Sequence, residues 1–156
     1  MPFHFIAMST SEAEQFRTGG LDAYGNAPEQ LISDGNGNPC RHCMQDIPVG
    51  KPMLALSYRP FAHLQPYAET GPILLCGESC KRHAESAQMP PSIAQRSEFI
   101  MRGYSRDERI VEGTGGVVAT SSMKERSAAI FNLPEVTSIH VRSATNNCFF
   151  CSIVER

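Results

Sequence analysis

Short runs of strand-forming residues, separated by proline, glycine and other turn formers, constrain the fold of this chain most strongly. Long amphipathic helices do not alternate with these runs, as parallel βαβ units would require. We therefore expect an α+β fold with one twisted, mostly antiparallel sheet and two or three short covering helices. The predicted strands are residues 3–8, 53–58, 73–76, 98–104, 109–112, 116–120, 136–141 and 149–154.

Three segments favour short helices. Ser9, Thr10 and Ser11 are possible N-caps for a helix over residues 12–17, and Ser79 is a possible cap within a polar helix over 78–87. A third helix is predicted from about residue 121 to 132, just before Pro134. Residues 21–39 contain so many turn formers that we expect a loop there.

Size and charge exclude several classes of protein. The chain has 156 residues, 41% hydrophobic and 19% charged, which is typical of one soluble domain spanning residues 1–156. A formal net charge of -2 with scattered basic residues argues against a nucleic-acid partner. The apolar runs are too short to cross a membrane, and no signal peptide is evident at the start, so we expect a cytoplasmic protein. An exposed edge strand would permit dimerisation, although nothing in the sequence requires it.

The six cysteines form the sharpest chemical pattern in the sequence. Cys40 and Cys43 form a C-x-x-C pair directly after the turn-forming run GNGNP, which lets the chain reverse between two thiols. A second group, Cys76-x3-Cys80-x2-His83, follows two predicted strands and overlaps the start of a predicted helix. This order is typical of a treble-clef zinc site, with Cys80 and His83 on one helical face.

Three interpretations of the thiols remain open. The first is a structural zinc site on Cys40, Cys43 and Cys80, with a fourth ligand from His83, Cys76 or Cys148. The second is a redox dithiol at Cys40 and Cys43, whose pKa values the neighbouring Arg41 and His42 would lower. The third is that the thiols are small, partly buried apolar groups, which suits Cys151 best. A strand through Phe149 and Phe150 would turn Cys148 and Cys151 to opposite faces, so we do not expect both to bind one metal ion.

A group of polar residues indicates a possible ligand site. His140 and Arg142 are two residues apart on a predicted strand and therefore share a face. If other guanidinium groups converge there, they would bind a small anionic ligand, with His140 able to gate binding near neutral pH. The alternative is a solvated sheet face. The residues predicted to border this cleft are Arg59, Tyr67, Arg102, His140 and Arg142.

Several separated motifs resemble the bacterial family catalogued as domain of unknown function 1203. These motifs are SDGNGNPCRHC, MLALSYRPF, QPYAETGPILLCGESC, MRGYSRDERIVEGTG and IHVRSATNNCFFCSIVER. The resemblance implies a small bacterial protein and no particular reaction, so whether the chain is an enzyme stays open. In this family the place of Cys76 is commonly His, and that of His83 varies. The resemblance therefore implies Cys40, Cys43, Cys80 and Cys148 as the zinc ligands.

Overall fold

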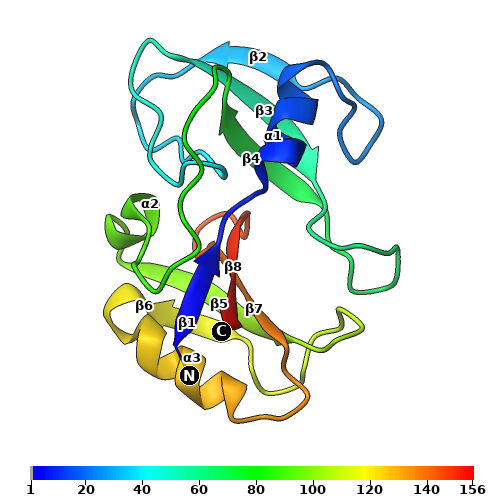
Figure 1. The fold of residues 1–156 in the computed structure, drawn as a ribbon, viewed down its shortest axis with the longest axis vertical. Coiled ribbons are helices and arrows are strands. Elements are labelled where there is room, and N and C mark those ends of the chain that lie inside the picture. Colours follow the sequence, from blue (N-terminus) through cyan, green and yellow to red (C-terminus); the bar gives the residue numbers. More distant parts are fainter. Residues whose placement is uncertain (1) are drawn as a thin grey trace.

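The computed structural model describes residues 2–156, which form two antiparallel sheets (Figure 1). The five-stranded sheet has the order β1-β8-β7-β5-β6, and the three-stranded sheet has the order β2-β3-β4. Every strand pair within the two sheets is antiparallel, so the expected α+β fold with antiparallel pairing is confirmed. The strands are β1 (Phe3–Ile6), β2 (Glu29–Ile32), β3 (Pro52–Tyr58), β4 (Gly71–Cys76), β5 (Glu98–Tyr104), β6 (Gly116–Ala119), β7 (Ser138–Ser143) and β8 (Phe149–Glu155).

Three α-helices accompany the sheets: α1 (Thr10–Arg17), α2 (Pro91–Ala94) and α3 (Met123–Phe131). The Ser9 side chain accepts a hydrogen bond from the backbone N–H of Glu12 and so caps α1, as predicted. Helix α1 lies beside the three-stranded sheet, whereas α3 lies at the opposite end of the molecule, against the five-stranded sheet (Figure 1). Within residues 2–156 no helix has the length and hydrophobicity needed to cross a membrane.

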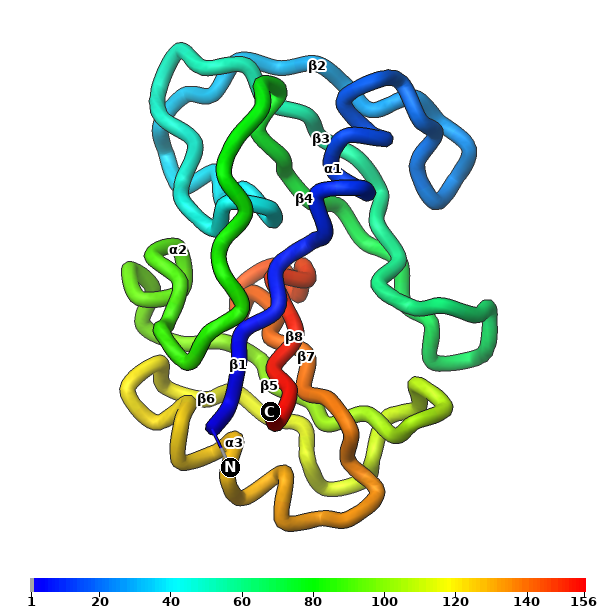
Figure 2. The backbone as a smooth tube through the Cα atoms, in the orientation of Figure 1, coloured from blue at the N-terminus to red at the C-terminus, as the bar shows by residue number. Residues whose placement is uncertain are grey.

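Two clusters of buried apolar residues divide the molecule into two halves. We call the five-stranded sheet with α2 and α3 the large half; its core includes Phe99, Ile139 and Ile153, all at most 1% exposed. The small half comprises the three-stranded sheet, α1 and the Cys40 loop (residues 33–51), and it has a smaller core under β3 and β4. Figure 2 shows the chain running from β1 in the large half to α1 in the small half. The two halves are therefore interleaved along the sequence.

The structure corrects the expectation of a single sheet. Strands β3 and β4 pair with each other, and β2 adds to β3 from within the segment predicted as a loop. Pro72 lies in β4, where it has no N–H to donate to a further strand. The predicted strand over 109–112 is reduced to a single bridge between Tyr104 and Ile110.

The predicted helix over residues 78–87 does not form; this stretch is irregular. Several of its polar groups bond to distant parts of the chain. The Arg82 side chain donates to the carbonyl oxygens of Met8 and Ala7, and the backbone N–H of His83 donates to the carbonyl oxygen of His42. Tertiary contacts thus override the helical propensity of the segment. The treble-clef arrangement, which needs a helix at Cys80, is wrong.

Candidate metal centre

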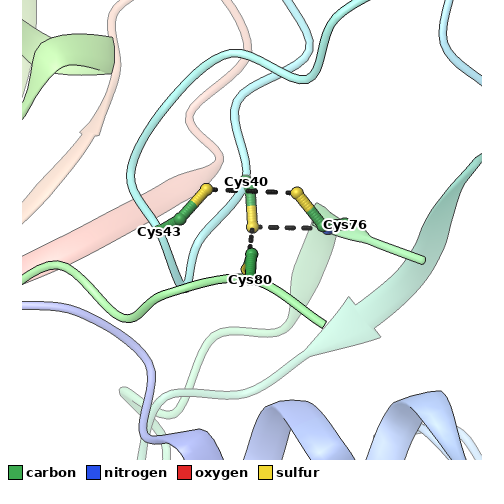
Figure 3. Close-up of side chains that lie close together, drawn as sticks. All are labelled: Cys40, Cys43, Cys76 and Cys80. Carbon is green, nitrogen blue, oxygen red and sulfur yellow. Dashed lines mark hydrogen bonds between the residues drawn. The ribbon is translucent and has the colours of Figure 1, made fainter. Parts of the chain in front are cut away.

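Four cysteine sulfurs come together at one edge of the small half. The Sγ atoms of Cys40, Cys43, Cys76 and Cys80 all lie within 4.8 Å of one another (Figure 3). The pairs Cys40–Cys80 and Cys43–Cys76 are each 3.9 Å apart. A zinc ion bonded to sulfur at about 2.3 Å in a tetrahedron places neighbouring sulfurs about 3.8 Å apart. The cluster therefore has the dimensions of a tetrathiolate site, and all four cysteines are free of disulfides.

A tight turn positions the first pair of sulfurs. The backbone N–H of Met44 donates to the carbonyl oxygen of Cys40, and the N–H of Cys40 donates to Gln45, each at 3.0 Å. Met44 has a φ of 58°, a left-handed conformation that is uncommon for a residue other than glycine. The turn also directs the N–H of His42 to the Sγ of Cys40, 3.4 Å away. This reversal brings Cys40 and Cys43 to the same centre.

The end of β4 positions the second pair. The N–H of Gly77 donates to the carbonyl oxygen of Pro52 at 2.9 Å, which is the last contact before the chain turns away. A Cβ atom at Gly77 would lie 3.1 Å from the backbone of Pro52, a close approach that favours glycine at this turn. The N–H of Cys76 donates to the Sγ of Cys40 at 3.3 Å. Cys80 then returns to the cluster four residues later.

Two basic side chains contact the sulfur of Cys80. Arg17 at the end of α1 donates from Nη2 to this sulfur at 3.0 Å and from Nε to the carbonyl oxygen of Cys76 at 2.9 Å. His42 is 1% exposed and lies between Cys80 and Thr10: its Nδ1 is 3.1 Å from the Cys80 sulfur and its Nε2 is 2.9 Å from the Thr10 hydroxyl. Such surrounding donors stabilise thiolates and orient metal ligands.

The four clustered thiols differ in the direction in which their pKa values are shifted. Hydrogen bonds from the neighbouring thiols, Cys40 first, hold the pKa of Cys80 far below its usual range, and His42 adds to this effect. Hydrogen bonds from Cys43 and then Cys76 lower the pKa of Cys40 to about 6. The pKa values of Cys43 and Cys76 are raised, in both cases mainly by the interaction with Cys40. Cys80 and Cys40 are thus the members of the cluster that lose their protons first, and a thiolate is the form that binds a metal ion.

The fourth sulfur belongs to Cys76 and not to Cys148. Cys148 lies in the turn between β7 and β8, where its Sγ is 3.7 Å from the carbonyl oxygen of Asn146. The side chain of Arg41 makes the contact between the Cys40 loop and this hairpin, by donating from Nε to the carbonyl oxygen of Phe149 at 2.7 Å. His83 also lies outside the cluster, with Nε2 3.4 Å from the carbonyl oxygen of Gln88. Cys151 is fully buried in the core of the large half.

The residues predicted to border an anion cleft separate into two groups. Arg102, His140 and Arg142 share one face of the five-stranded sheet, since Arg102 is directly opposite His140 in the β5–β7 pairing. The carboxylate of Glu69 pairs with Arg102 and lies 3.9 Å from Nη1 of Arg142. A carboxylate of the chain itself therefore faces these guanidinium groups.

The other two residues have different surroundings. Arg59 lines a separate cavity of about 380 Å³ together with Tyr58 and Phe149. The guanidinium carbon of Arg109 lies over the ring of Tyr67, 5.5 Å from its centroid.

His140 packs among aromatic rings, with centroid distances of 4.2 Å to Tyr104 and 5.0 Å to Phe149. Burial, followed by the charges of Arg142 and Arg102, lowers the pKa of His140 to about 3. At neutral pH its imidazole is uncharged and does not gate an anion site.

Comparison with known proteins identifies a family and no activity. The model of a family described as protein of unknown function (DUF1203) matches residues 37–156, a range that contains all four clustered cysteines. No curated protein and no solved structure gives a significant match to the chain.

Proposed function

The chain belongs to the DUF1203 family of proteins of unknown function, and we propose that it is a zinc-binding domain in which four cysteines hold one structural zinc ion. The observation that carries this proposal is the mutual distance of the four sulfurs, at most 4.8 Å. The two shortest separations, 3.9 Å, match the edge of a zinc tetrathiolate.

The donor set favours a structural rather than a catalytic ion. Four thiolates complete a tetrahedral shell and leave no position for water or substrate. Thiolate ligands also select zinc over the oxygen-preferring ions magnesium and calcium. Zinc with four thiolates carries a net charge of -2, and Arg17 supplies a compensating guanidinium group through its contact with Cys80. The site therefore has ligands, geometry and charge compensation for a closed zinc centre.

The ion would connect three parts of the small half that are distant in the sequence, in addition to backbone hydrogen bonds such as that from Arg41 to Leu74. Cys40 and Cys43 lie in the Cys40 loop, Cys76 ends β4, and Cys80 begins the irregular segment that leads to α2. In the absence of a helix at Cys80, backbone hydrogen bonding within this segment is sparse. A metal bond at Cys80 replaces that missing regular structure as the restraint on the chain.

A redox dithiol at Cys40 and Cys43 is the alternative. Such a pair needs two sulfurs, whereas the structure surrounds it with two more from Cys76 and Cys80. The basic residue Arg41 in the C-x-x-C sequence donates to the carbonyl oxygens of Phe149 and Pro39 and makes no hydrogen bond to the sulfurs. Of the two basic residues expected to lower the pKa values of this pair, Arg41 therefore makes no such contact, and the imidazole of His42 contacts the sulfur of Cys80, outside the pair.

Elemental analysis of protein purified without added metal tests the proposal. We expect about one equivalent of zinc per chain, lost on Cys76→Ser and retained on Cys148→Ser, the matched control. Cys76→His replaces one zinc ligand with another, so we expect it to retain zinc even if Cys76→Ser does not fold.

Three results would overturn the proposal. One is less than about a tenth of an equivalent of zinc together with freely reactive thiols, because a structural ion is part of the folded state. Another is stoichiometric iron in place of zinc. The third is a disulfide between Cys40 and Cys43, detected by peptide mapping as the loss of two hydrogens.

A further inference from the structure

A second site lies where the two halves meet, outside the sulfur cluster. A cavity of about 320 Å³ opens between β4, the Cys40 loop and the β7–β8 turn. In Figure 2 that turn, coloured orange to red, reaches toward β4. The residues that line the cavity include two arginines, Arg41 and Arg96, and no aspartate or glutamate. We propose that this cavity binds a small oxyanion, a phosphate or carboxylate group, between Arg41 and Arg96, with the thiol of Cys148 beside it.

Arg41 contributes a buried charge without a counterion. Its side chain is 3% exposed, and its guanidinium carbon lies 4.4 Å from the centroid of the Phe150 ring. Nε and Nη1 donate to the carbonyl oxygens of Phe149 and Pro39, which are neutral acceptors. Within residues 2–156 it forms no ion pair and its Nη2 has no hydrogen-bond partner. Burial of an unpaired cation is unfavourable, and an anion in the cavity removes that penalty.

Arg96 places a second guanidinium group near the ring of Phe150. Its guanidinium carbon lies 5.4 Å from the Phe150 centroid. Nη1 donates to Asp46 at 3.1 Å and to the carbonyl oxygen of Ser92 at 2.6 Å. Nε and Nη2, which form one bidentate edge of the group, make no hydrogen bond to the described part of the chain. A planar or tetrahedral oxyanion fits such an edge.

The surroundings favour a small ligand with one strong negative charge. Two guanidinium groups near one ring repel each other, and Asp46 offsets only the charge of Arg96. The rim is polar and uncharged: it carries the hydroxyls of Ser143 and Thr145, which lie 3.1 Å apart. The volume is at the low end of the range for small-molecule sites. These features together favour a ligand that is small and negatively charged.

Cys148 provides a reporter inside the cavity. Its thiol lines the same space as the two arginines, whereas Cys151 is buried and the other cysteines form the sulfur cluster. Iodoacetate and iodoacetamide both alkylate a thiolate: the sulfur bonds to the methylene carbon, iodide leaves, and the thiol proton goes to the buffer. Only iodoacetate carries the carboxylate that the arginines would attract. The ratio of the two rates at Cys148 therefore measures the anion site.

The experiment measures both rates by mass spectrometry of the peptide that contains Cys148. At constant ionic strength, we expect the ratio of the iodoacetate rate to the iodoacetamide rate to fall by at least about threefold on Arg96→Gln. Arg126→Gln is the matched control, since Arg126 lines a different cavity and donates to the carbonyl oxygen of Thr114. We also expect inorganic phosphate to slow alkylation by iodoacetamide more than chloride does. An acetate arm distinguishes a carboxylate site from a phosphate site.

Two outcomes would overturn the proposal. One is a ratio that is unchanged on Arg96→Gln in a folded variant. The other, which needs no variant, is equal alkylation rates in phosphate, acetate and chloride at the same ionic strength. Zinc measured on the same samples separates this result from the metal centre, because the reporter thiol is not one of the four clustered cysteines.

Discussion

The large half and the small half solve the problem of stability differently. In the large half, facing strands bury whole rows of apolar side chains: Phe99 and Met101 in β5 and Ile139 and Val141 in β7 are all 0% exposed. In the small half, all four residues of β2 are exposed, and two long irregular segments cover the remaining strands. The small half also brings four cysteine sulfurs together, and we propose that a metal ion bound there supplements its smaller apolar core. The difference teaches that one fold can combine a packed core and a proposed metal cross-link, each serving its own region.

The largest expected effect is a loss of amide protection confined to the small half. If zinc cross-links the small half as proposed, its removal by a chelator should lower amide protection at Leu54 and Leu75 by at least about ten-thousandfold. Protection at Met101 and Val141 in the large half should fall much less. Hydrogen exchange followed residue by residue measures both. Equal loss of protection in the two halves would show that they do not differ in this way.

The next effect is the loss of stability caused by a substitution in the core of the large half. Phe99 is 0% exposed and packs edge-to-face on Phe150, with centroids 5.0 Å apart. We expect Phe99→Ala to lower the free energy of unfolding by about 3–5 kcal/mol, because it leaves a cavity in a core that has no metal bond to compensate. Urea denaturation measures the loss. Val117→Ala, at a position 61% exposed on β6, is the control and should cost less than about 0.5 kcal/mol.

For Phe99→Ala we also expect the folded protein to keep its zinc. Loss of zinc without loss of large-half stability would contradict the assignment of the two roles.

The smallest effect concerns acid. The pKa of His140 is lowered to about 3 in the folded protein by burial and by the charges of Arg142 and Arg102, and it is about 6.5 in an unfolded chain. The unfolded state therefore binds a proton that the folded state does not. Stability should fall by about 1 kcal/mol as the pH drops from about 6.5 to about 5.5.

His140→Phe isolates this contribution, since it keeps an aromatic ring beside Tyr104 and removes the titration. We expect the free energy of unfolding to depend less steeply on pH in the variant than in the wild type over that range. Parallel curves would show that His140 does not cause the acid sensitivity of the protein over that range.

Sequence patterns were informative where one face of a strand is buried. The residue pattern predicted strands at β5 and β7 and placed His140 and Arg142 on one face, and the observed pairing adds Arg102 to that face. Strand β2 was missed because Leu31 and Ile32 are exposed and follow no alternating pattern. The residues of the false helix over 78–87 have adequate local propensity, but long-range hydrogen bonds, which no local pattern encodes, determine their conformation.

The metal centre was only partly predictable for a related reason. The C-x-x-C spacing singled out Cys40 and Cys43, and the Cys76-x3-Cys80-x2-His83 pattern added Cys80. The resemblance then led to the prediction of Cys148 in place of Cys76 as the fourth ligand, whereas the structure brings the sulfur of Cys76 into the cluster. Which sulfur completes the group depends on the path of the Cys40 loop past β4, where Cys40 bridges to Leu74.

One residue belongs to both halves at once. Met44 forms the left-handed turn beside Cys43, yet its side chain is fully buried in the core of the large half, and its carbonyl oxygen accepts a hydrogen bond from Ser92. Glycine would relax the backbone there but would empty the space that the methionine fills. A β-branched side chain would fill space but fit the left-handed turn worse. The mutational paths open to this position are therefore narrow, and the sulfur turn and the distant apolar core are expected to evolve together rather than drift apart.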